Sequence, residues 1–371
     1  MRTILDRAGN SPYNGSAAQR RISMVSMKDV SRHAGVSVAT VSNVITGKRQ
    51  VSESVRRRVL DSIAALNYQV NLVARGLKTQ RTSTIGLILP DITKLFFQRV
   101  ITGILTEASQ MGYRLNILNS GYDFQTERTL INMLRASRVD GIILDSCVNR
   151  ENAAQWAEEL QRGGQGAQPV VSLENTLYSQ SVSSVTLDCA LYSGMITQHL
   201  FDLGRRRVLY VAGPLSIEHE YDRLRGYREC HEKNSLQAAA EMEKHGGYLS
   251  ESGYVAVREA LTDGLRFDAV QASSDQAAIG ALKALHECGL RVPEDVAVCG
   301  FDNLFPASLV SPAVTTVDVP NFEMGRLAVR ELIECIENPE RPPCCRRVEA
   351  KLVVRASSLA QTPSNWDLDG W

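Results

Sequence analysis

The sequence predicts a small all-α helix-turn-helix module joined to a larger α/β body with doubly wound parallel sheets. Three observations support this division. Short capped helical patterns occupy residues 26–78, apolar runs alternate with helical stretches from Thr84 onward, and the two regions differ in charge. Residues 1–81 carry 14 Lys/Arg and four Asp/Glu, a net +10, although the whole chain is neutral. A basic module on an acidic body indicates that the front end meets a polyanion.

The front module shows start and turn signals for three helices. Ser26 and Asp29 have capping-box spacing, and Gly35 supplies a tight turn after the first helix. Ser37 can cap the second helix and Ser52 the third. Two helices joined by a short glycine-containing turn form a helix-turn-helix pattern. An ordinary small helical bundle is the alternative, and the basic charge favours the DNA-binding interpretation.

A separate hinge segment, 71–81, follows the module. Asn71 can cap a short helix that has Leu72 and Leu77 on its apolar side. Such a helix is too short to be stable alone, and Gly76 weakens it by about 1 kcal/mol. We therefore expect the hinge helix to form only against a partner chain and DNA.

The body contains nine short apolar runs separated by helical stretches. Continuous apolar runs are typical of parallel sheets covered on both faces. Nine of them suit two doubly wound subdomains better than one. The runs are 85–90, 115–120, 141–146, 169–174, 184–188, 208–213, 269–274, 296–301 and 315–319, and 351–358 reads as a last strand.

Ligands of open sheets bind beyond the carboxyl ends of the strands. Five polar residues stand at such ends, and they are Asp91, Glu174, Ser274, Asp275 and Asp302.

Composition and motifs argue against other protein classes. The eight cysteines show no CxxC spacing, so thiols in a reducing cytosol are expected rather than disulfides or a zinc site. No apolar run resembles a signal peptide or a membrane span, which predicts a soluble cytoplasmic protein without membrane contact. GxGxxG, GxxxxGK[ST], HExxH and GxSxG are missing, and the six histidines lack metal-ligand spacing. We therefore predict no metal, no cofactor and no enzymatic activity.

Both regions resemble the lactose-repressor/galactose-repressor (LacI/GalR) family of transcription factors. In the front module the matching segments are KDVSRHAGVSVATVSNV (28–44), Val51-Ser52, ALNY (65–68), Asn71 and ARGLK (74–78). In the body they are FFQRVITGI (96–104), RVDGIILD (138–145), AGPLS (212–216), RLRGY (223–227), ASSDQAAIGAL (272–282), RVPEDVAVCGFDN (291–303) and PAVTTV (312–317). The resemblance covers most of the chain.

The resemblance implies a domain organisation. A DNA-binding headpiece would occupy 25–70, a hinge 71–81, and an effector-binding and dimerisation core similar to periplasmic binding proteins 82–358. The core would have two lobes joined by chain crossings near 190, 317 and 343. These are an N-lobe of about 82–189 and 318–342, and a C-lobe of about 190–317 and 343–358. Residues 1–24 are expected to be a disordered arm. The tail, 359–371, has no leucine heptad, so we expect a homodimer through the core.

The resemblance also implies roles on DNA. Val38, Ala39 and Asn43 match base-reading positions; the first two can make only apolar contacts, and Asn43 can pair with adenine. Leu77 matches the leucine that the family's hinge inserts into the minor groove. The side chains suited to phosphate oxygens are Ser37, Thr40, Ser42 and Lys48.

For the effector, Arg223 matches an arginine that holds ligand hydroxyls or carboxylates, and Asp275 an aspartate that accepts hydroxyl hydrogen bonds. Phe96, Phe97 and Tyr248 match aromatic wall positions, with interior packing as the alternative role for the phenylalanines. Further candidates, at positions that vary with ligand, are Asp91, Glu174 and His219. This mixture indicates a polyhydroxylated or carboxylated metabolite, and a sugar fits best.

We therefore predict a ligand-responsive regulator, a homodimer that represses carbohydrate-use genes by binding a palindromic operator in double-stranded DNA. The alternatives are a corepressor-dependent regulator of biosynthetic genes, a global regulator that needs a partner protein, and an enzyme fused to a DNA-binding domain.

Overall fold

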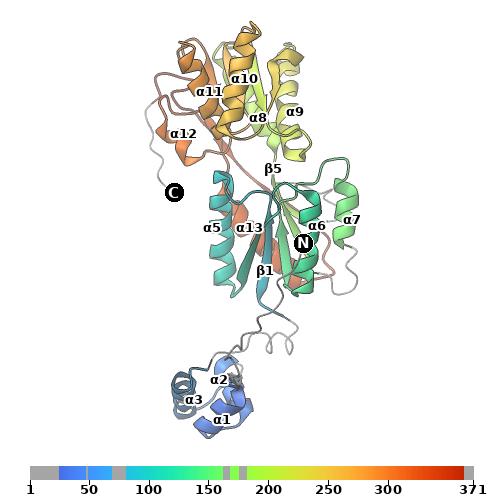
Figure 1. Cartoon of the computed structure of the whole chain (residues 1–371), viewed down its shortest axis with the longest axis vertical. Coiled ribbons are helices and arrows are strands. Elements are labelled where there is room, and N and C mark those ends of the chain that lie inside the picture. The colour runs from blue at the N-terminus through green and yellow to red at the C-terminus, as the bar shows by residue number, and fades with distance from the viewer. Residues whose placement is uncertain (1–24, 47–48, 69–80, 162–167, 175–181, 363–371) are drawn as a thin grey trace, which may run out of the picture. The chain divides into compact units, whose positions relative to one another are not determined.

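The computed structural model describes residues 25–46, 49–68, 81–161, 168–174 and 182–362, and the chain divides into two compact units at Lys78/Thr79 (Figure 1). The predicted arm at 1–24, nearly all of the predicted hinge and most of the tail lie outside the described residues. None of the described helices is long and apolar enough to cross a membrane.

The front unit contains the three expected helices. They are α1 (Met27–Ala34), α2 (Val38–Thr46) and α3 (Glu53–Ala65). The predicted capping box is formed by Ser26 and Asp29, and Gly35 ends α1 with φ of 63°, a left-handed conformation that suits glycine. Val30, Val41 and Val59, one from each helix, are fully buried and hold the unit together.

The predicted cap of the third helix differs in detail. The helix does begin directly after Ser52, but the Ser52 side chain makes no capping hydrogen bond. Its hydroxyl lies 3.2 Å from that of Ser54 instead. The extended backbone of Ser52 starts the helix without help from its side chain.

The N-lobe of the core is a six-stranded sheet in which every pair is parallel, as predicted. Its order is β11-β5-β4-β3-β1-β2. The strands are β1 (Thr84–Leu89), β2 (Arg114–Asn119), β3 (Gly141–Leu144), β4 (Val170–Leu173), β5 (Ser183–Leu187) and β11 (Cys345–Val348).

Helices cover both faces of this sheet. Figure 1 shows α5 (Leu95–Gln110) and α13 (Asn321–Glu337) on one side, and α6 (Phe124–Ala136) and α7 (Ala153–Gln161) on the other. Successive side chains of β1 point to opposite faces of the sheet, and because both faces are covered by helices, its whole apolar run is buried. Leu87 packs in the cluster with α5 and α13, whereas Ile88 packs in the cluster with α6 and α7.

The C-lobe repeats this arrangement around a four-stranded parallel sheet of order β7-β6-β8-β9. Its strands are β6 (Val208–Ala212), β7 (Glu243–His245), β8 (Ala269–Ala272) and β9 (Ala297–Cys299). Its helices are α8 (Cys189–Asp202), α9 (Glu218–Lys233), η1 (Ala240–Met242), α10 (Ser250–Thr262), α11 (Asp275–Glu287) and α12 (Phe305–Leu309). Apolar residues of β6 alternate between a cluster with α8 and α9 and one with α10 and α11.

The connection between the lobes corrects one predicted boundary. The C-lobe was expected to resume at 343, but β11 pairs with β5 in the N-lobe sheet, so the last crossing lies between β11 and β12 (Lys351–Val353). There β12 runs antiparallel to β10 (Thr316–Asp318). The strand β11 was not predicted because its sequence, Cys345-Arg346-Arg347-Val348, is polar. It lies at the edge of the sheet with a neighbour on one side only, where polar residues are tolerated. The edge strand β7 escaped prediction for the same reason.

Candidate functional site

The first turn of α2 is the candidate nucleic-acid interface of the front unit. Val38 is 39% exposed and Ala39 is also exposed, whereas Val41 is completely buried. Asn43 is half-buried one turn further along the helix. An exposed first turn is what a helix needs in order to meet base edges in the major groove. Contact of these residues with bases stays a prediction.

The hydroxyl groups of Ser37 and Thr40 at the start of α2 form a hydrogen bond with each other. The Ser37 Oγ accepts the backbone N–H of Thr40 at 3.0 Å and lies 2.8 Å from the Thr40 Oγ1. One hydroxyl proton is used between them, so the second can be donated to a phosphate oxygen. Ser42 is half-buried, and Lys48 lies outside the described residues. The phosphate roles likewise stay predictions.

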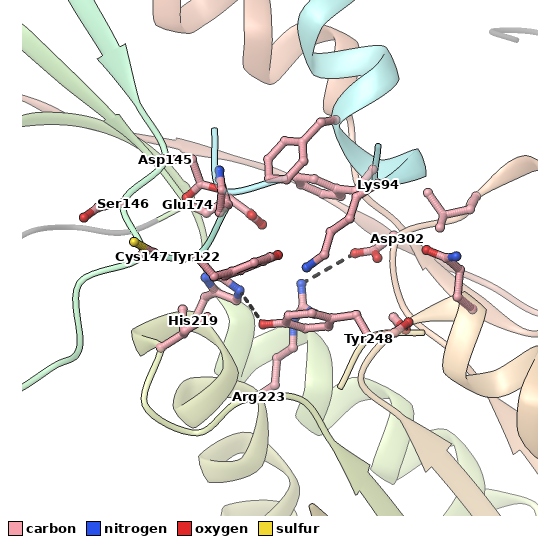
Figure 2. A pocket seen from close by; sticks show the side chains of 17 residues that line it. Lys94, Tyr122, Asp145, Ser146, Cys147, Glu174, His219, Arg223, Tyr248 and Asp302 are labelled. Carbon is pink, nitrogen blue, oxygen red and sulfur yellow. Dashed lines mark hydrogen bonds and ion pairs between the residues drawn. The ribbon is translucent and has the colours of Figure 1, made fainter. Parts of the chain in front are cut away.

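A cavity between the two core lobes is the candidate effector site (Figure 2). It has about 560 Å³ of empty space, including its open mouth. Loops at the carboxyl ends of the strands form its walls together with the N-terminal parts of α5, α9 and α11, in agreement with the strand-end rule. Six of the eight predicted effector residues line it: Phe96, Phe97, Glu174, His219, Arg223 and Tyr248.

The two phenylalanines both line the cavity and pack in the interior. Phe96 and Phe97 are only 9% and 3% exposed, and their rings meet edge to face with centroids 5.2 Å apart. Both of their predicted roles are therefore compatible with the structure.

Two of the predicted effector residues lie outside the cavity lining. Asp275, the expected hydroxyl acceptor, is completely buried, and its Oδ2 accepts the backbone N–H of Leu304 at 2.6 Å. Burial raises the pKa of Asp275 to about 7. Asp91 turns back on its own loop, where it accepts the Thr93 backbone N–H and hydroxyl at 2.9 and 2.7 Å. Both carboxylates shape loops of the cavity instead of facing into it.

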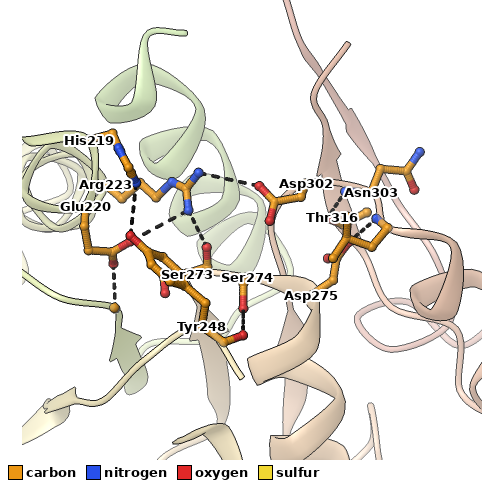
Figure 3. A network of polar contacts seen from close by, with 12 residues as sticks. His219, Glu220, Arg223, Tyr248, Ser273, Ser274, Asp275, Asp302, Asn303 and Thr316 are labelled. Atoms are coloured by element: carbon orange, nitrogen blue, oxygen red, sulfur yellow. Dashed lines mark hydrogen bonds and ion pairs between the residues drawn. The ribbon is translucent and has the colours of Figure 1, made fainter. Parts of the chain in front are cut away.

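Arg223 on α9 is the centre of a buried polar network (Figure 3). Its Nη1 donates to the Ser273 carbonyl at 2.6 Å and lies 3.7 Å from Glu220, and its Nη2 lies 3.5 Å from Asp302. Glu220 in turn accepts the Gly213 N–H at 2.8 Å. Burial raises the pKa of both carboxyl groups, and the guanidinium opposes that rise. The sequence motif predicted Arg223 as a site residue. It did not predict that Glu220 and Asp302 pair with it.

His219 and Tyr248 form a second polar pair in the wall. The His219 Nε2 lies 3.0 Å from the Tyr248 hydroxyl. Burial lowers the pKa of His219 well below its usual value, and the charges of Arg223 and Lys94 lower it further. A neutral imidazole is therefore expected at pH 7, able to donate through one ring nitrogen and accept through the other.

Some polar residues of the lining were predicted from their positions at strand ends, and others were not predicted. Asp302 and Ser274 follow strand ends and were nominated by that rule, and both line the cavity. Asp145, directly after β3, has the same signal and was overlooked. Lys94 and Tyr122 stand in the loops after β1 and β2, where no motif marked them.

The backbone around the cavity is unusual. Tyr122, Glu174 and Asp302 have φ angles of 59°, 55° and 104°. Positive φ in residues other than glycine is strained and is concentrated at functional sites. All three side chains line the cavity, which supports its assignment as a binding site.

Chemically, the cavity can recognise a small hydroxylated molecule. Carboxylates accept hydroxyl hydrogen bonds, the imidazole can donate or accept, and aromatic rings can cover an apolar face. Within the described part of the chain, no cluster of three His, Cys, Asp or Glu residues could hold a metal ion. All eight cysteines are free thiols.

Comparison with known proteins assigns both parts of the chain. Residues 26–71 match the bacterial regulatory proteins of the lacI family, and 197–358 match a periplasmic binding protein-like domain. The ribose operon repressor of Escherichia coli K12 is 34% identical over 316 residues, covering 85% of this chain and 94% of that protein.

Two solved structures are similar over 90% of this chain and 99% of their own. The Lac repressor dimer bound to operator and the anti-inducer ONPF has a TM-score of 0.81 and 27% identity. The complex of the transcriptional regulator CelR with cellobiose has a TM-score of 0.68 and 30% identity. The chain therefore belongs to the LacI family, as a DNA-binding transcription regulator with a periplasmic-binding-protein-like effector domain.

Proposed function

We propose that the protein is a homodimeric repressor of carbohydrate-use genes, released from or held on its operator by a small hydroxylated effector. The observation that carries this proposal is the cavity between the core lobes, whose wall combines aromatic rings, an imidazole and carboxylates. The likeness to a ribose operon repressor and to a regulator bound to cellobiose supports the sugar class. The likeness to the Lac repressor dimer on its operator supports the dimer.

On DNA, two headpieces would read the half-sites of a palindrome. Val38 and Ala39 would make apolar contacts with base edges, and Asn43 would pair with adenine. Leu77, outside the described residues, would enter the minor groove at the centre of the site. Leu77→Ala is then expected to weaken specific binding far more than nonspecific binding. Fluorescence anisotropy measures the affinity for operator and for random DNA. Equal losses of affinity for both would show that Leu77 does not insert into the minor groove of the operator.

The effector would act by closing the lobes around the cavity. Three chain segments connect the lobes, and β10 and β12 pair where two of them cross. Closure would change the relative position of the N-lobes in the dimer and so bias hinge pairing. Such coupling commonly amounts to about 1–3 kcal/mol, or about 5–150-fold in operator affinity.

The test begins with an operator selected from random DNA by the full-length protein. Its affinity is then measured with and without a panel of sugars. Arg223→Ala, assayed well below its lowered melting temperature, should keep operator binding and lose the effector response, because the guanidinium orders the wall of the cavity. Arg225→Ala is the matched control, since this arginine lies on the same helix but pairs with Asp222 and Glu229 at the surface. A normal sugar response in the folded Arg223→Ala protein would move the effector site elsewhere.

A further inference from the structure

Lys94 places its own ammonium group inside the effector cavity. The side chain starts from the loop before α5, and its Nζ lies 3.9 Å from the ring centre of Tyr248 and 4.6 Å from that of Tyr122. The two rings come from different lobes, and Figure 2 shows the lysine pointing toward them. Two aromatic faces around one ammonium are a recognised arrangement for binding a cation.

Carboxylates face the same region from three strand ends. Asp145, Glu174 and Asp302 all line the cavity, and Asp145 is only 3% exposed. Burial raises the pKa of Asp145 and of Glu174, and the negative charge of Glu174 raises that of Asp145 further. At Glu174 the guanidinium of Arg223 and then the ammonium of Lys94 oppose the rise, and at Asp145 the ammonium of Lys94 opposes it.

The positive charges of the cavity do not balance its carboxylates. Arg223 is already engaged by Asp302 and by the buried Glu220. Lys94 and Arg223 together act on four carboxyl groups, those of Asp145, Glu174, Glu220 and Asp302, so the carboxyl groups outnumber these two cations. A carboxylated or phosphorylated ligand would add a like charge in a buried place, whereas a ligand ammonium would supply the missing cation.

The opposite wall offers hydrogen bonds suited to hydroxyl groups. His219 is 9% exposed, and its Nδ1 has no hydrogen-bond partner among the described residues. Its other nitrogen is held by the Tyr248 hydroxyl. A ligand hydroxyl can satisfy the Nδ1, because buried polar atoms are rarely left unpaired.

We propose that the effector is a hydroxylated small molecule with a basic amine, such as an amino sugar, whose ammonium pairs with Asp145 and Glu174 and replaces that of Lys94 between the two tyrosine rings. This inference rests on the proposed function, because it names the ligand class of the same cavity. It narrows the expectation from the sequence, which left sugars and carboxylated metabolites open.

The test compares matched ligands on the full-length protein by thermal shift and calorimetry. The set contains glucosamine, galactosamine and mannosamine, their N-acetyl forms, the parent hexoses and the corresponding uronic acids. At least one amine should bind about tenfold or more tightly than its N-acetyl and parent forms, a factor equal to about 1.4 kcal/mol. The uronic acids should not stabilise the protein. If a parent hexose or a uronic acid bound as tightly as the amine or more tightly, the proposal of an amine ligand would be wrong. The proposal of a sugar effector would still stand. No binding by any compound would count against both.

Two variants separate charge recognition from structural damage. Asp145→Asn should lower affinity for the amine about tenfold while changing affinity for the N-acetyl form less than twofold. Lys94→Ala should raise affinity for the amine, because the competing ammonium is removed. Lys283→Ala is the control, since its side chain is 69% exposed and pairs with Glu287 on the surface of α11. Parallel losses of amine and N-acetyl binding in Asp145→Asn, or weaker amine binding in Lys94→Ala, would refute the assignment.

Discussion

Replacing Arg223 by methionine should strongly destabilise the core, because it removes the cation that pairs with two buried carboxyl groups. Methionine keeps most of the length and the apolar volume of arginine. It loses the bond to the Ser273 carbonyl and the ion pairs to Glu220 and Asp302, which are 0% and 7% exposed. Breaking a buried pair by removing one partner costs about 3–5 kcal/mol. In a domain of this size, we expect the melting temperature to fall by roughly 10 °C.

The loss should depend on pH with a defined sign. Without Arg223, the folded-state pKa values of Glu220 and Asp302 should rise further above those of the unfolded chain. The folded form then binds more protons than the unfolded one between those values, so its stability falls as the pH rises. The deficit of Arg223→Met should therefore be smaller at pH 5 than at pH 8.

Urea denaturation of the full-length protein at both pH values measures this effect. Arg225→Met is the matched control on α9, where 44% of the side chain is exposed; exposed ion pairs of this kind contribute at most about 1 kcal/mol. A deficit no larger than that of the control would refute the reasoning. A deficit that is equal at both pH values, or larger at pH 5, would show that the carboxyl groups are not its cause.

Three further substitutions test other parts of the molecule. Asn43→Ala should weaken operator binding by about 1–3 kcal/mol through one symmetric base pair. A uniform loss of affinity across single-base operator variants would indicate that Asn43 contacts the DNA phosphate backbone instead. Gly103→Ala should destabilise the core by about 1–3 kcal/mol, since a Cβ there would lie 2.0 Å from the Phe322 carbonyl oxygen, and unchanged melting would contradict this close approach of α5 and α13. Gly35→Ala should cost about 1–2 kcal/mol from its φ of 63° alone, because its Cβ would meet no atom within 4 Å. Faster hydrogen exchange in α1 and α2 would report that cost, and Gly35→Asn should recover part of it.

Most of the core fold could be predicted because its central strands are buried on both faces. The run Ile85–Leu89 is completely or almost completely buried, and such a strand must be apolar at every position. The strands β7 and β11 escaped because each lies at a sheet edge and carries charged residues, so their sequences resemble loops. The predicted boundary at 343 was wrong for this reason.

The cavity was only partly predictable. The motif around Arg223 predicted that residue, and the strand-end rule predicted Glu174, Ser274 and Asp302, all of which line the cavity. Asp275 shows the limit of that rule, since its side chain turns toward the Leu304 backbone. Lys94 and Tyr122 lie 28 positions apart in loops with no distinctive pattern, and only folding brings them together.

By itself, the sequence determined the helix-turn-helix headpiece, the α/β class of the core, the family and the DNA-binding function. These properties depend on local periodicity, capping residues and short motifs, which are written in neighbouring positions. Only the tertiary structure decided where the chain crosses between the lobes for the last time and where the Lys94 ammonium lies. It also decided which carboxylates line the cavity and which pair with Arg223. Those properties depend on strands and side chains that are far apart in the sequence and meet only after folding, so local sequence patterns do not encode them.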